Sequence, residues 1–299
     1  MLSISIPVFN IKIDNLVLAL HQQAEKLNIP FEIRVYDDNS KATVKQHNRR
    51  LKEIKNVVYV ELEENVGRAA IRNKMGFDSR FEWLLFIDAD SRINHENYLE
   101  NYIKSQQNNL VVCGGTSYSD EKPYDQNLLR WKYGTVRESI SADLRNKQKG
   151  FIITSNNFMI EKNVFKKIHF REEIREYGHE DTLLGYDLFK NEIKIVHIDN
   201  PLEHTGLEDA VTFLEKSKSA LINLLFISEK MFADTEEFNV QIPFLYRYKK
   251  ITRFISPFFF RFFFKLFGAV LEKNLKGKHP SLFLFDVYKV FYYSTIKKP

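Results

Sequence analysis

The sequence predicts an α/β protein whose core is a mostly parallel β-sheet with helices on both faces. Two observations lead to this fold class. Apolar runs of strand length alternate with stretches of helical period, and such alternation is typical of parallel sheets with helical crossovers. Gly and Pro together number only 19 of 299 residues, which excludes collagen-like and linker-rich chains.

The first part of the chain contains five strand-like runs with four helical stretches between them. We expect strands at Leu2–Phe9, Phe31–Tyr36, Val57–Leu62, Trp83–Ile87 and Leu110–Cys113. We expect helices at Ile13–Leu27, Lys41–Glu53, Arg68–Ser79 and His95–Gln107. The first helix illustrates the reasoning, because Leu16, Leu20 and Ala24 recur at a spacing that places them on one face.

The alternation becomes less regular after Ser117, where a polar and mostly helical stretch extends to Gly150. Beyond it we expect strands at Phe151–Ile160 and Lys194–Ile198 and helices at Glu180–Lys190 and Asp209–Met231. The composition changes near Ile242–Pro243. We therefore predict an α/β domain over residues 1–243 and a helical tail over 244–299.

The charge is divided unequally between these two parts. The net charge of the chain is +5, but residues 244–299 alone carry +10 and residues 1–243 carry −5. The tail also holds 12 of the 26 Phe. An acidic body with a basic, aromatic tail disfavours a nucleic-acid-binding protein, and no nucleic-acid motif is present.

The single cysteine and the first residues bear on the compartment. Cys113 is the only cysteine, which excludes an intramolecular disulfide and a Cys-based zinc site. The first ten residues have a strand pattern and not the basic and apolar regions of a signal peptide. These features predict a reducing, cytoplasmic environment.

Polar residues follow four of the expected strands, at Asn10, Asp37–Asp38, Asn65 and Asp88–Asp90. One such loop is most simply an ordinary turn or helix cap, because Asp and Asn are common there. Four in succession favour a ligand site, since ligands bind outside the carboxyl ends of the strands in open α/β sheets.

Asp88 and Asp90 follow the apolar run Trp83–Ile87. Carboxylates at i and i+2 of an extended segment point to the same side, where they can hold one divalent cation that in turn binds a diphosphate. Arg68 and Arg72 share a helix face at i and i+4, near the helix N-terminus. They suit a phosphate or a polar base, although a solvated pair after a Gly67 turn explains them equally well.

Two further motifs contain a candidate base and a candidate metal ligand. Glu180 and Asp181 begin a helix, where they are either ordinary N-terminal acidic residues or a carboxylate base facing the same cleft. His204 follows a strand and a turn, and a lone histidine is usually structural; its imidazole could also complete a metal site begun by Asp90.

Taken in order, these residues resemble the inverting family 2 glycosyltransferases of the GT-A fold. The segments that carry the resemblance are Ile6–Asn10, Asp37–Ser40, Asn65–Arg68 with Ala70–Asn73, Asp88–Asp90, Ser155–Ile160 and Tyr177–Asp181. The match extends over about residues 1–232. It implies a Rossmann-like GT-A sheet and transfer of one sugar from a nucleotide sugar, most simply a UDP-sugar.

The resemblance also implies a role for each matching residue. The nucleotide-sugar side would comprise Pro7, Phe9, Asp38, Asn65, Arg68, Arg72, Asp88, Ala89 and Asp90. Asp38 would bind the base, Asp88 the ribose, and Asp90 with His204 the Mn²⁺ or Mg²⁺ on the diphosphate. Asp181 would be the general base, and Asn156, Asn157 and Glu180 would lie on the acceptor side.

Two departures from the family pattern matter. Asn39 stands where a glycine commonly follows the Asp pair, and we expect the turn to survive because Asn tolerates positive φ. The Gln-x-x-Arg-Trp motif of processive synthases is absent after the base motif; Gln126–Trp131 has one residue too many and precedes Asp181. A non-processive enzyme is therefore expected.

The tail segment Ile255–Glu272 predicts an amphipathic helix. Arg261, Lys265, Gly268 and Glu272 fall on one narrow stripe, and Phe, Leu and Val fill the rest. The run is short for a bilayer span and contains two cations, so we expect an in-plane helix on an anionic membrane. Packing on the catalytic domain and a dimer contact are the alternatives.

The sequence thus predicts a glycosyltransferase that acts on a saccharide or lipid-linked acceptor at the inner face of the cell membrane. The oligomeric state is left open. The alternatives are a sugar-phosphate nucleotidyltransferase, whose Gly-rich basic first loop is missing, and a membrane-bound scaffold without activity. Intact Asp38, Asp88, Asp90 and Asp181 argue against the scaffold.

Overall fold

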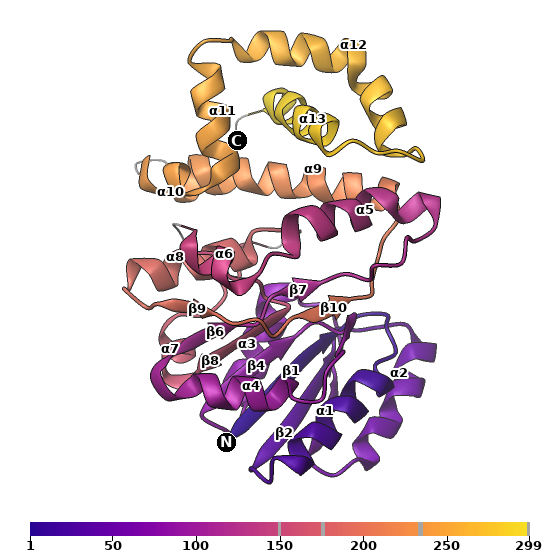
Figure 1. Cartoon of the computed structure of the whole chain (residues 1–299), viewed down its shortest axis with the longest axis vertical. Helices are drawn as coiled ribbons and strands as arrows, with labels where there is room; N and C mark the ends of the chain where they lie inside the picture. The colour runs from indigo at the N-terminus through magenta and orange to yellow at the C-terminus, as the bar shows by residue number, and fades with distance from the viewer. Residues whose placement is uncertain (149–150, 175–176, 233–235, 298–299) are drawn as a thin grey trace. The chain divides into compact units, whose positions relative to one another are not determined.

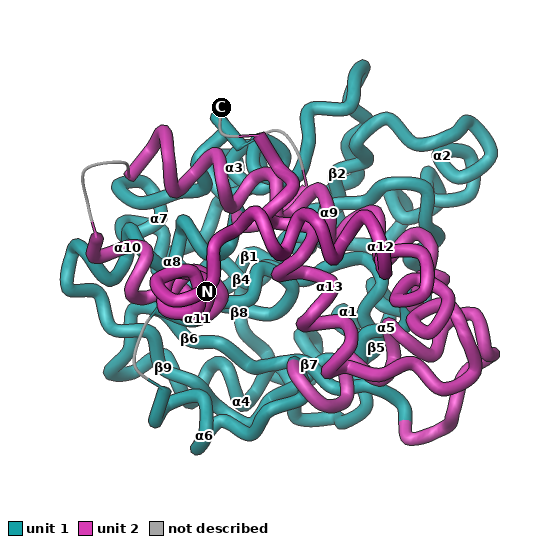
Figure 2. The backbone as a smooth tube through the Cα atoms, turned by 90° about the horizontal axis from the view of Figure 1, so that it is seen from above, with its two compact units in different colours: residues 1–119, 138–175, 180–206 teal, residues 120–137, 176–179, 207–299 magenta. Residues whose placement is uncertain are grey.

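The computed structural model describes residues 1–148, 151–174, 177–232 and 236–297. The chain forms two compact units (Figure 2). Unit 1 comprises residues 1–119, 138–175 and 180–206, and unit 2 comprises 120–137, 176–179 and 207–299. The composition boundary at 243/244 falls inside unit 2.

Unit 1 is built on a seven-stranded sheet of order β3-β2-β1-β4-β8-β6-β9 (Figure 1). Its strands are β1 (Leu2–Val8), β2 (Phe31–Asp37), β3 (Val57–Glu61), β4 (Trp83–Ile87), β6 (Val111–Cys113), β8 (Asn157–Glu161) and β9 (Ile195–His197). β8 runs antiparallel to β4 and β6, and the other neighbours are parallel. The prediction of a mostly parallel α/β sheet is confirmed.

Helices cover both faces of this sheet, and successive residues of β4 belong alternately to the two cores that result. Leu2, Ile4 and Ile6 belong to one core with α1 (Asp14–Lys26) and α4 (Tyr98–Ser105). Leu84 and Phe86 belong to a second core with α3 (Arg68–Asp78), α7 (Lys162–Lys167) and α8 (Glu180–Lys190). The remaining helices of unit 1 are α2 (Ala42–Asn48), followed by the 3₁₀ turn Arg49–Glu53, the 3₁₀ turn Gln106–Asn108, and α6 (Ala142–Lys147).

The strand predicted over Phe151–Ile160 is too long at its start. Residues 151–156 are irregular, and the strand begins at Asn157. Phe151 and Ile153 are buried although they lie outside the strand, because they pack toward α8, where Gly185 has no side chain to block the Phe151 carbonyl. An apolar run buried in a loop has the same sequence pattern as a strand.

A second, three-stranded sheet of order β5-β10-β7 is absent from the sequence-based prediction. Its strands are β5 (Ser91–Arg92), β10 (Leu202–His204) and β7 (Thr116–Ser117). β10 pairs antiparallel with β5, so that His204 lies opposite Ser91. Strands of two or three residues give no detectable period.

Unit 2 is helical. Its elements are the 3₁₀ turn Asp125–Asn127, α5 (Leu128–Tyr133), the π turns Gly134–Glu138 and Ile227–Met231, α9 (Ala210–Phe226), α10 (Glu236–Gln241), α11 (Pro243–Thr252), α12 (Pro257–Leu275) and α13 (Leu282–Thr295). A core of Leu129, Phe213, Leu271, Leu275 and Phe285 joins α5, α9, α12 and α13. Asp209 caps α9 by accepting the Thr212 N–H at 2.8 Å.

Within the described ranges, no single helix is long and apolar enough to cross a bilayer. α11 and α12 meet the criteria of length and composition only as a pair, and the pair is bent by 106°.

Candidate active site

A cavity of about 190 Å³ opens at the carboxyl ends of β1, β2 and β4. It is lined by Pro7, Val8, Phe9, Ile11, Asp38, Arg68, Ile71, Arg72, Asp88, Ala89 and Asp90. Eight of the nine residues expected on the nucleotide-sugar side are among them, and the ninth, Asn65, is not. The ends of β1, β2 and β4 and the start of α3 therefore converge, as expected at the carboxyl ends of parallel strands.

The Asp38 carboxylate is held by backbone N–H groups of the loop before α3. It accepts from Val66 at 2.7 Å and from Gly67 at 3.2 Å. Burial raises the pKa of Asp38, and these two N–H groups only partly offset the effect. Asn65 donates to the Asp38 carbonyl at 3.1 Å, so its amide supports the loop.

The turn at Asn39 has the expected geometry. Its φ is +62°, in the left-handed region that Asn adopts more readily than most residues. Asp37, the other member of the pair, is fully buried and accepts the Ser40 N–H at 2.6 Å. Asp37 therefore forms the turn, whereas Asp38 faces the cavity.

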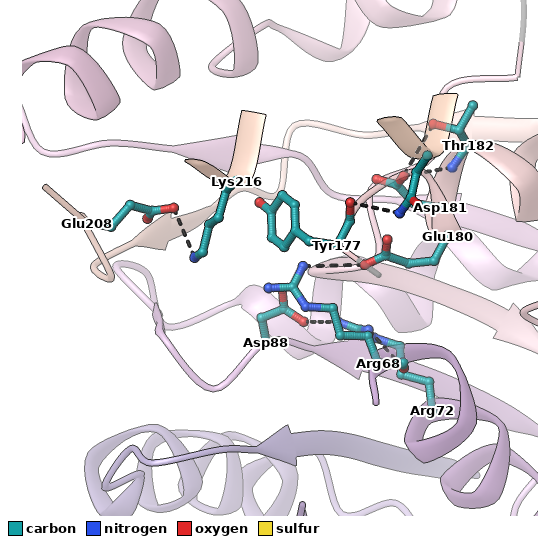
Figure 3. A network of polar contacts seen from close by, with 10 residues as sticks. Arg68, Arg72, Asp88, Tyr177, Glu180, Asp181, Thr182, Glu208 and Lys216 are labelled. Atoms are coloured by element: carbon teal, nitrogen blue, oxygen red, sulfur yellow. Dashed lines mark hydrogen bonds and ion pairs between the residues drawn. The ribbon is translucent and has the colours of Figure 1, made fainter. Parts of the chain in front are cut away.

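Arg72 and Asp88 form an ion pair in the wall of the cavity. Arg72 is almost completely buried, and its Nη2 donates to Asp88 Oδ1 at 2.5 Å (Figure 3). Its Nη1 donates to the Arg68 carbonyl at 3.1 Å. Arg68 is half exposed, and its Nη1 lies 3.4 Å from Glu180 Oε1. The two arginines thus have different partners.

The prediction that Asp88 to Asp90 is extended is wrong. Residues 89–90 form a turn, closed by the Ser91 N–H donating to the Asp88 carbonyl at 3.2 Å. The turn separates the two carboxylates, because Asp88 contacts Arg72 and Asp90 contacts His204. The two carboxylates therefore have different partners.

Asp90 and His204 lie together because β5 pairs with β10. His204 Nδ1 is 3.5 Å from Asp90 Oδ1. Burial opposes ionisation of Asp90, but the hydrogen bond and charge of His204 outweigh it and hold the pKa of Asp90 below 3.8. A Cβ at Gly206 would collide with the Asp90 carboxylate. Gly206 therefore leaves the space in which this carboxylate lies.

The Asp90 carboxylate and the His204 imidazole fit a divalent cation whose remaining ligands come from the substrate. One carboxylate and one imidazole are suitable ligands for Mn²⁺. In the described part of the chain, no cluster of three or more His, Cys, Asp or Glu side chains has metal-binding geometry. Further ligands would have to come from a bound diphosphate or from water.

Glu180 and Asp181 begin α8, with Glu180 directed toward Arg68 (Figure 3). The Thr182 N–H donates to Asp181 Oδ1 at 2.7 Å. Burial and then the adjacent Glu180 charge raise the pKa of Asp181 to about 7, despite this hydrogen bond and the Arg72 charge. A carboxylate with such a pKa is suited to accept a proton near neutral pH.

The two asparagines expected on the acceptor side differ in their surroundings. Asn157 is fully buried, and its Oδ1 accepts from Tyr98 and Tyr102, both at 2.6 Å. Its amide donates to the Gly115 and Asn200 carbonyls, which gives Asn157 a structural role. Asn156 instead contacts the Asp88–Asp90 segment through its backbone, because its carbonyl accepts the Asp88 N–H at 3.2 Å.

Sequence reasoning missed the residues that hold β10. Glu203 accepts from Arg92 at 2.5 Å and from Asn94 at 2.7 Å. This clamp fixes the strand that carries His204. The only signal in the sequence is the position of Glu203 beside His204.

Comparison with known proteins identifies the family. The model of "Glycosyl transferase family 2" matches residues 3–169, more than half of the chain. No curated protein matches the chain in sequence.

Solved structures share the fold at low sequence identity. TarS 1-349 from S. aureus is 17% identical, with a TM-score of 0.51 over 98% of this chain and 89% of that one. The same fragment solved with UDP gives 0.52 at 17% identity over the same shares. A mannosyltransferase from Pyrobaculum calidifontis, solved with GDP-Man and Mn²⁺, is 14% identical, with a TM-score of 0.62 over 98% and 85%. With the family match, the sheet order and the strand-end cavity, these likenesses establish that the chain belongs to glycosyl transferase family 2 and is a glycosyltransferase of the GT-A fold.

Proposed function

We propose that the protein is a metal-dependent, inverting and non-processive glycosyltransferase that uses a UDP-sugar. The observation that carries the proposal is the strand-end cavity, whose lining residue Asp90 lies 3.5 Å from His204. The acceptor would be a hydroxyl group of a saccharide or of a lipid-linked molecule. Residues 1–243 would form the catalytic domain, and residues 244–299 would contact the membrane.

The charges of the cavity support a need for a cation. Three carboxylates, those of Asp38, Asp88 and Asp90, line it together with two guanidiniums. A diphosphate brings further negative charge, so its binding is unfavourable without a counter-ion. A divalent cation held by Asp90 and His204 would supply that charge and stabilise the departing diphosphate. The imidazole nitrogen favours Mn²⁺ over Mg²⁺, which prefers oxygen ligands.

The other lining residues have roles suited to a nucleoside. Pro7 and Phe9 offer apolar surface to the base, and Asp38 offers a carboxylate edge to its N–H groups. Asp88, which accepts a hydrogen bond from Arg72, would bind the ribose hydroxyls. Arg68 lines the cavity and is half exposed, and its guanidinium would bind a phosphate oxygen.

Asp181 is proposed as the general base. It would take the proton of the acceptor hydroxyl while that oxygen attacks the anomeric carbon opposite the diphosphate. A single displacement of this kind inverts the configuration. The raised pKa of Asp181 supports the role, because a base that titrates near 7 can both accept and release a proton at neutral pH.

The proposed location is the cytoplasmic face of the cell membrane, supported by the basic and Phe-rich composition of residues 244–299. A nucleotidyltransferase remains the alternative enzyme. It differs in its chemistry, because it would release pyrophosphate from a nucleoside triphosphate, whereas a glycosyltransferase releases a nucleoside diphosphate.

The test is a thermal-shift panel of UDP, GDP, UDP-sugars and GDP-sugars, each with and without Mn²⁺. We expect stabilisation by a uridine nucleotide that depends on Mn²⁺. Slow release of UDP from the preferred UDP-sugar without acceptor would separate an enzyme from an inactive scaffold. Stabilisation by no nucleotide, or pyrophosphate release from UTP with a sugar phosphate, would contradict the proposal.

A further inference from the structure

α12 exposes an apolar face to solvent. Phe258, Leu266 and Val270 are 69%, 53% and 63% exposed, although all three are large hydrophobic residues. The same face includes Phe259, Phe262, Phe263 and Phe267, which are also exposed. The opposite side of the helix, with Phe260, Leu271 and Leu275, is buried. A contiguous apolar face of this kind on a helix marks an interaction surface.

The polar stripe of α12 has partners within unit 2. Arg261 Nε donates to the Ser294 carbonyl of α13 at 2.5 Å. Glu272 Oε1 accepts from the Tyr288 hydroxyl at 2.8 Å and lies 3.4 Å from Lys218 Nζ of α9. The stripe therefore anchors the helix to α13 and α9. Most of the exposed surface of α12 is its phenylalanine face, which Arg261 and Lys265 border on one side.

The segment that leads into this face is strongly basic. Between Glu237 and Glu272 the sequence has six Lys or Arg and no Asp or Glu. Three of the six, Lys249, Lys250 and Arg253, line a cavity of about 150 Å³ together with Glu236, Asn239, Val240 and Tyr246. No carboxylate of the described residues forms an ion pair with these three cations.

These features fit one occupant better than the others. A second copy of the chain would bring two faces of equal positive charge together, which Coulomb repulsion disfavours. An anionic bilayer offers negative headgroups beside an apolar interior, the complement of a basic cavity next to exposed phenylalanines. A transmembrane path is disfavoured by the 106° bend between α11 and α12 and by Arg261 and Lys265 within the run.

Resting on the membrane contact proposed above for residues 244–299, we propose that the exposed face of α12 inserts into the surface of an anionic bilayer, and that Lys249, Lys250 and Arg253 bind a phosphate of a lipid headgroup. α12 lies in the membrane plane, with its polar stripe toward α13. At 1.5 Å per residue its 19 residues span roughly 28 Å of that plane. Exposed Phe254 and Ile255 join the cavity to the inserted face.

The first test is flotation with vesicles of phosphatidylcholine alone and with phosphatidylglycerol added. The full chain is expected to bind the anionic vesicles and to bind the neutral ones much more weakly. Changing Lys249, Lys250 and Arg253 to Ser should lower the affinity on the order of 100-fold, because each cation near an anionic surface contributes about fivefold. The charge-matched control removes Lys26, Lys104 and Lys147, which are exposed on helices of unit 1, and should bind almost as wild type.

The second test addresses the apolar face. Changing Phe258, Leu266 and Val270 to Ser should lower vesicle binding by roughly 100-fold, because less apolar area is removed from water. The control changes three residues of similar exposure on other elements to Ser, and these are Leu18, Val136 and Leu144. It should leave binding unchanged. If the triple variant fails to fold, the single change Leu266→Ser serves as the test, and we expect it to lower vesicle binding about tenfold.

The third test measures insertion directly. The tryptophan of Phe262→Trp should shift its emission to the blue with anionic vesicles and be quenched by lipids brominated in the acyl chain. The tryptophan of Leu144→Trp should do neither.

Any of three results would overturn the proposal. One is absence of wild-type binding to anionic vesicles. Another is equal loss in a test variant and its control. The third is a solution dimer that the Phe258, Leu266 and Val270 changes convert to a monomer, without vesicle binding, which would assign the face to self-association. None of the assays uses glycosyl transfer, so their failure leaves the proposed reaction untouched, and failure of the reaction leaves them valid.

Discussion

Replacing Asp181 by Asn should abolish transfer while donor binding persists. Asn is nearly the same size but cannot accept the proton of the acceptor hydroxyl. Asp181 is not among the residues that line the nucleotide cavity. We therefore expect the affinity for UDP with Mn²⁺ to change less than threefold, and turnover to fall on the order of 10²- to 10⁴-fold, the usual contribution of a general base.

The pKa of about 7 sets the expected pH profile of the wild type. A base with that pKa is about one-tenth ionised at pH 6 and about nine-tenths ionised at pH 8. The kcat/KM should therefore rise about tenfold between these values and be level above them. Glu180→Gln removes the neighbouring charge that raises this pKa, so it should move the midpoint to lower pH and retain transfer.

The Asp181→Asn substitution also has a consequence for stability. The native pKa of Asp181 lies above its ordinary value of 3.8, so the folded protein binds the proton more tightly than the unfolded chain does. Its contribution to stability is present below pH 4 and is lost as pH rises through 7. The difference between the native pKa of about 7 and the ordinary value of 3.8 corresponds to a free energy of at most about 4 kcal/mol by which the fold disfavours the ionised carboxylate. Asp181→Asn should consequently unfold at a higher temperature than wild type at pH 8.

Two assays check this reasoning: initial rates from pH 5.5 to 8.5 with saturating Mn²⁺, and thermal unfolding over the same range. A flat kcat/KM between pH 6 and 8 would refute the assignment of the base. So would an Asp181→Asn variant that keeps a tenth of wild-type turnover. Equal unfolding temperatures at pH 8 would show that burial does not disfavour the carboxylate.

Three further predictions concern the metal side and the core. Asp90→Ala should remove the gain in UDP affinity that Mn²⁺ provides, measured by calorimetry with and without the ion; an unchanged gain would exclude Asp90 as a ligand. Gly206→Ala should weaken the same Mn²⁺-dependent affinity at least tenfold, because the new methyl group displaces the Asp90 carboxylate, and wild-type affinity would show that the loop adapts. Asn157→Ala should lower the free energy of unfolding by about 3 kcal/mol, because the buried Tyr98 and Tyr102 hydroxyls lose an acceptor; a fully stable variant with impaired turnover would instead support an acceptor role.

The first half of the fold could be predicted because its elements are long and locally determined. β4 is a continuous apolar run, apolar and polar residues alternate along β1 and β2, and α1 has a clear helical period. Polar residues stand at the end of each of these strands or within two residues after it, so most of the polar lining of the cavity could also be named in advance. The arrangement of parallel strands then brings Asp38, Asp88 and Asp90 together without further information.

What escaped prediction depends on contacts between distant residues. The turn at residues 88–90 and the β5–β10 pairing are set by tertiary contacts, such as the clamp of Arg92 on Glu203. The burial of Asn157 was hidden because its partners, Tyr98 and Tyr102, lie more than fifty residues away. Likewise, the helical period of α12 revealed its polar stripe, but only the structure indicates which side of the helix faces solvent.

The pairing of β5 with β10 has a consequence for the order in which the site is completed. Asp38, Asp88 and Asp90 all leave the ribosome within the first ninety residues, whereas His204 follows more than a hundred residues later. A nascent chain can therefore assemble the nucleotide cavity before the imidazole exists to share a cation with Asp90. We expect ribosome-bound chains that end before β10 to lack Mn²⁺-dependent nucleotide affinity. The enzyme would then become able to hold its donor only when synthesis has passed β10.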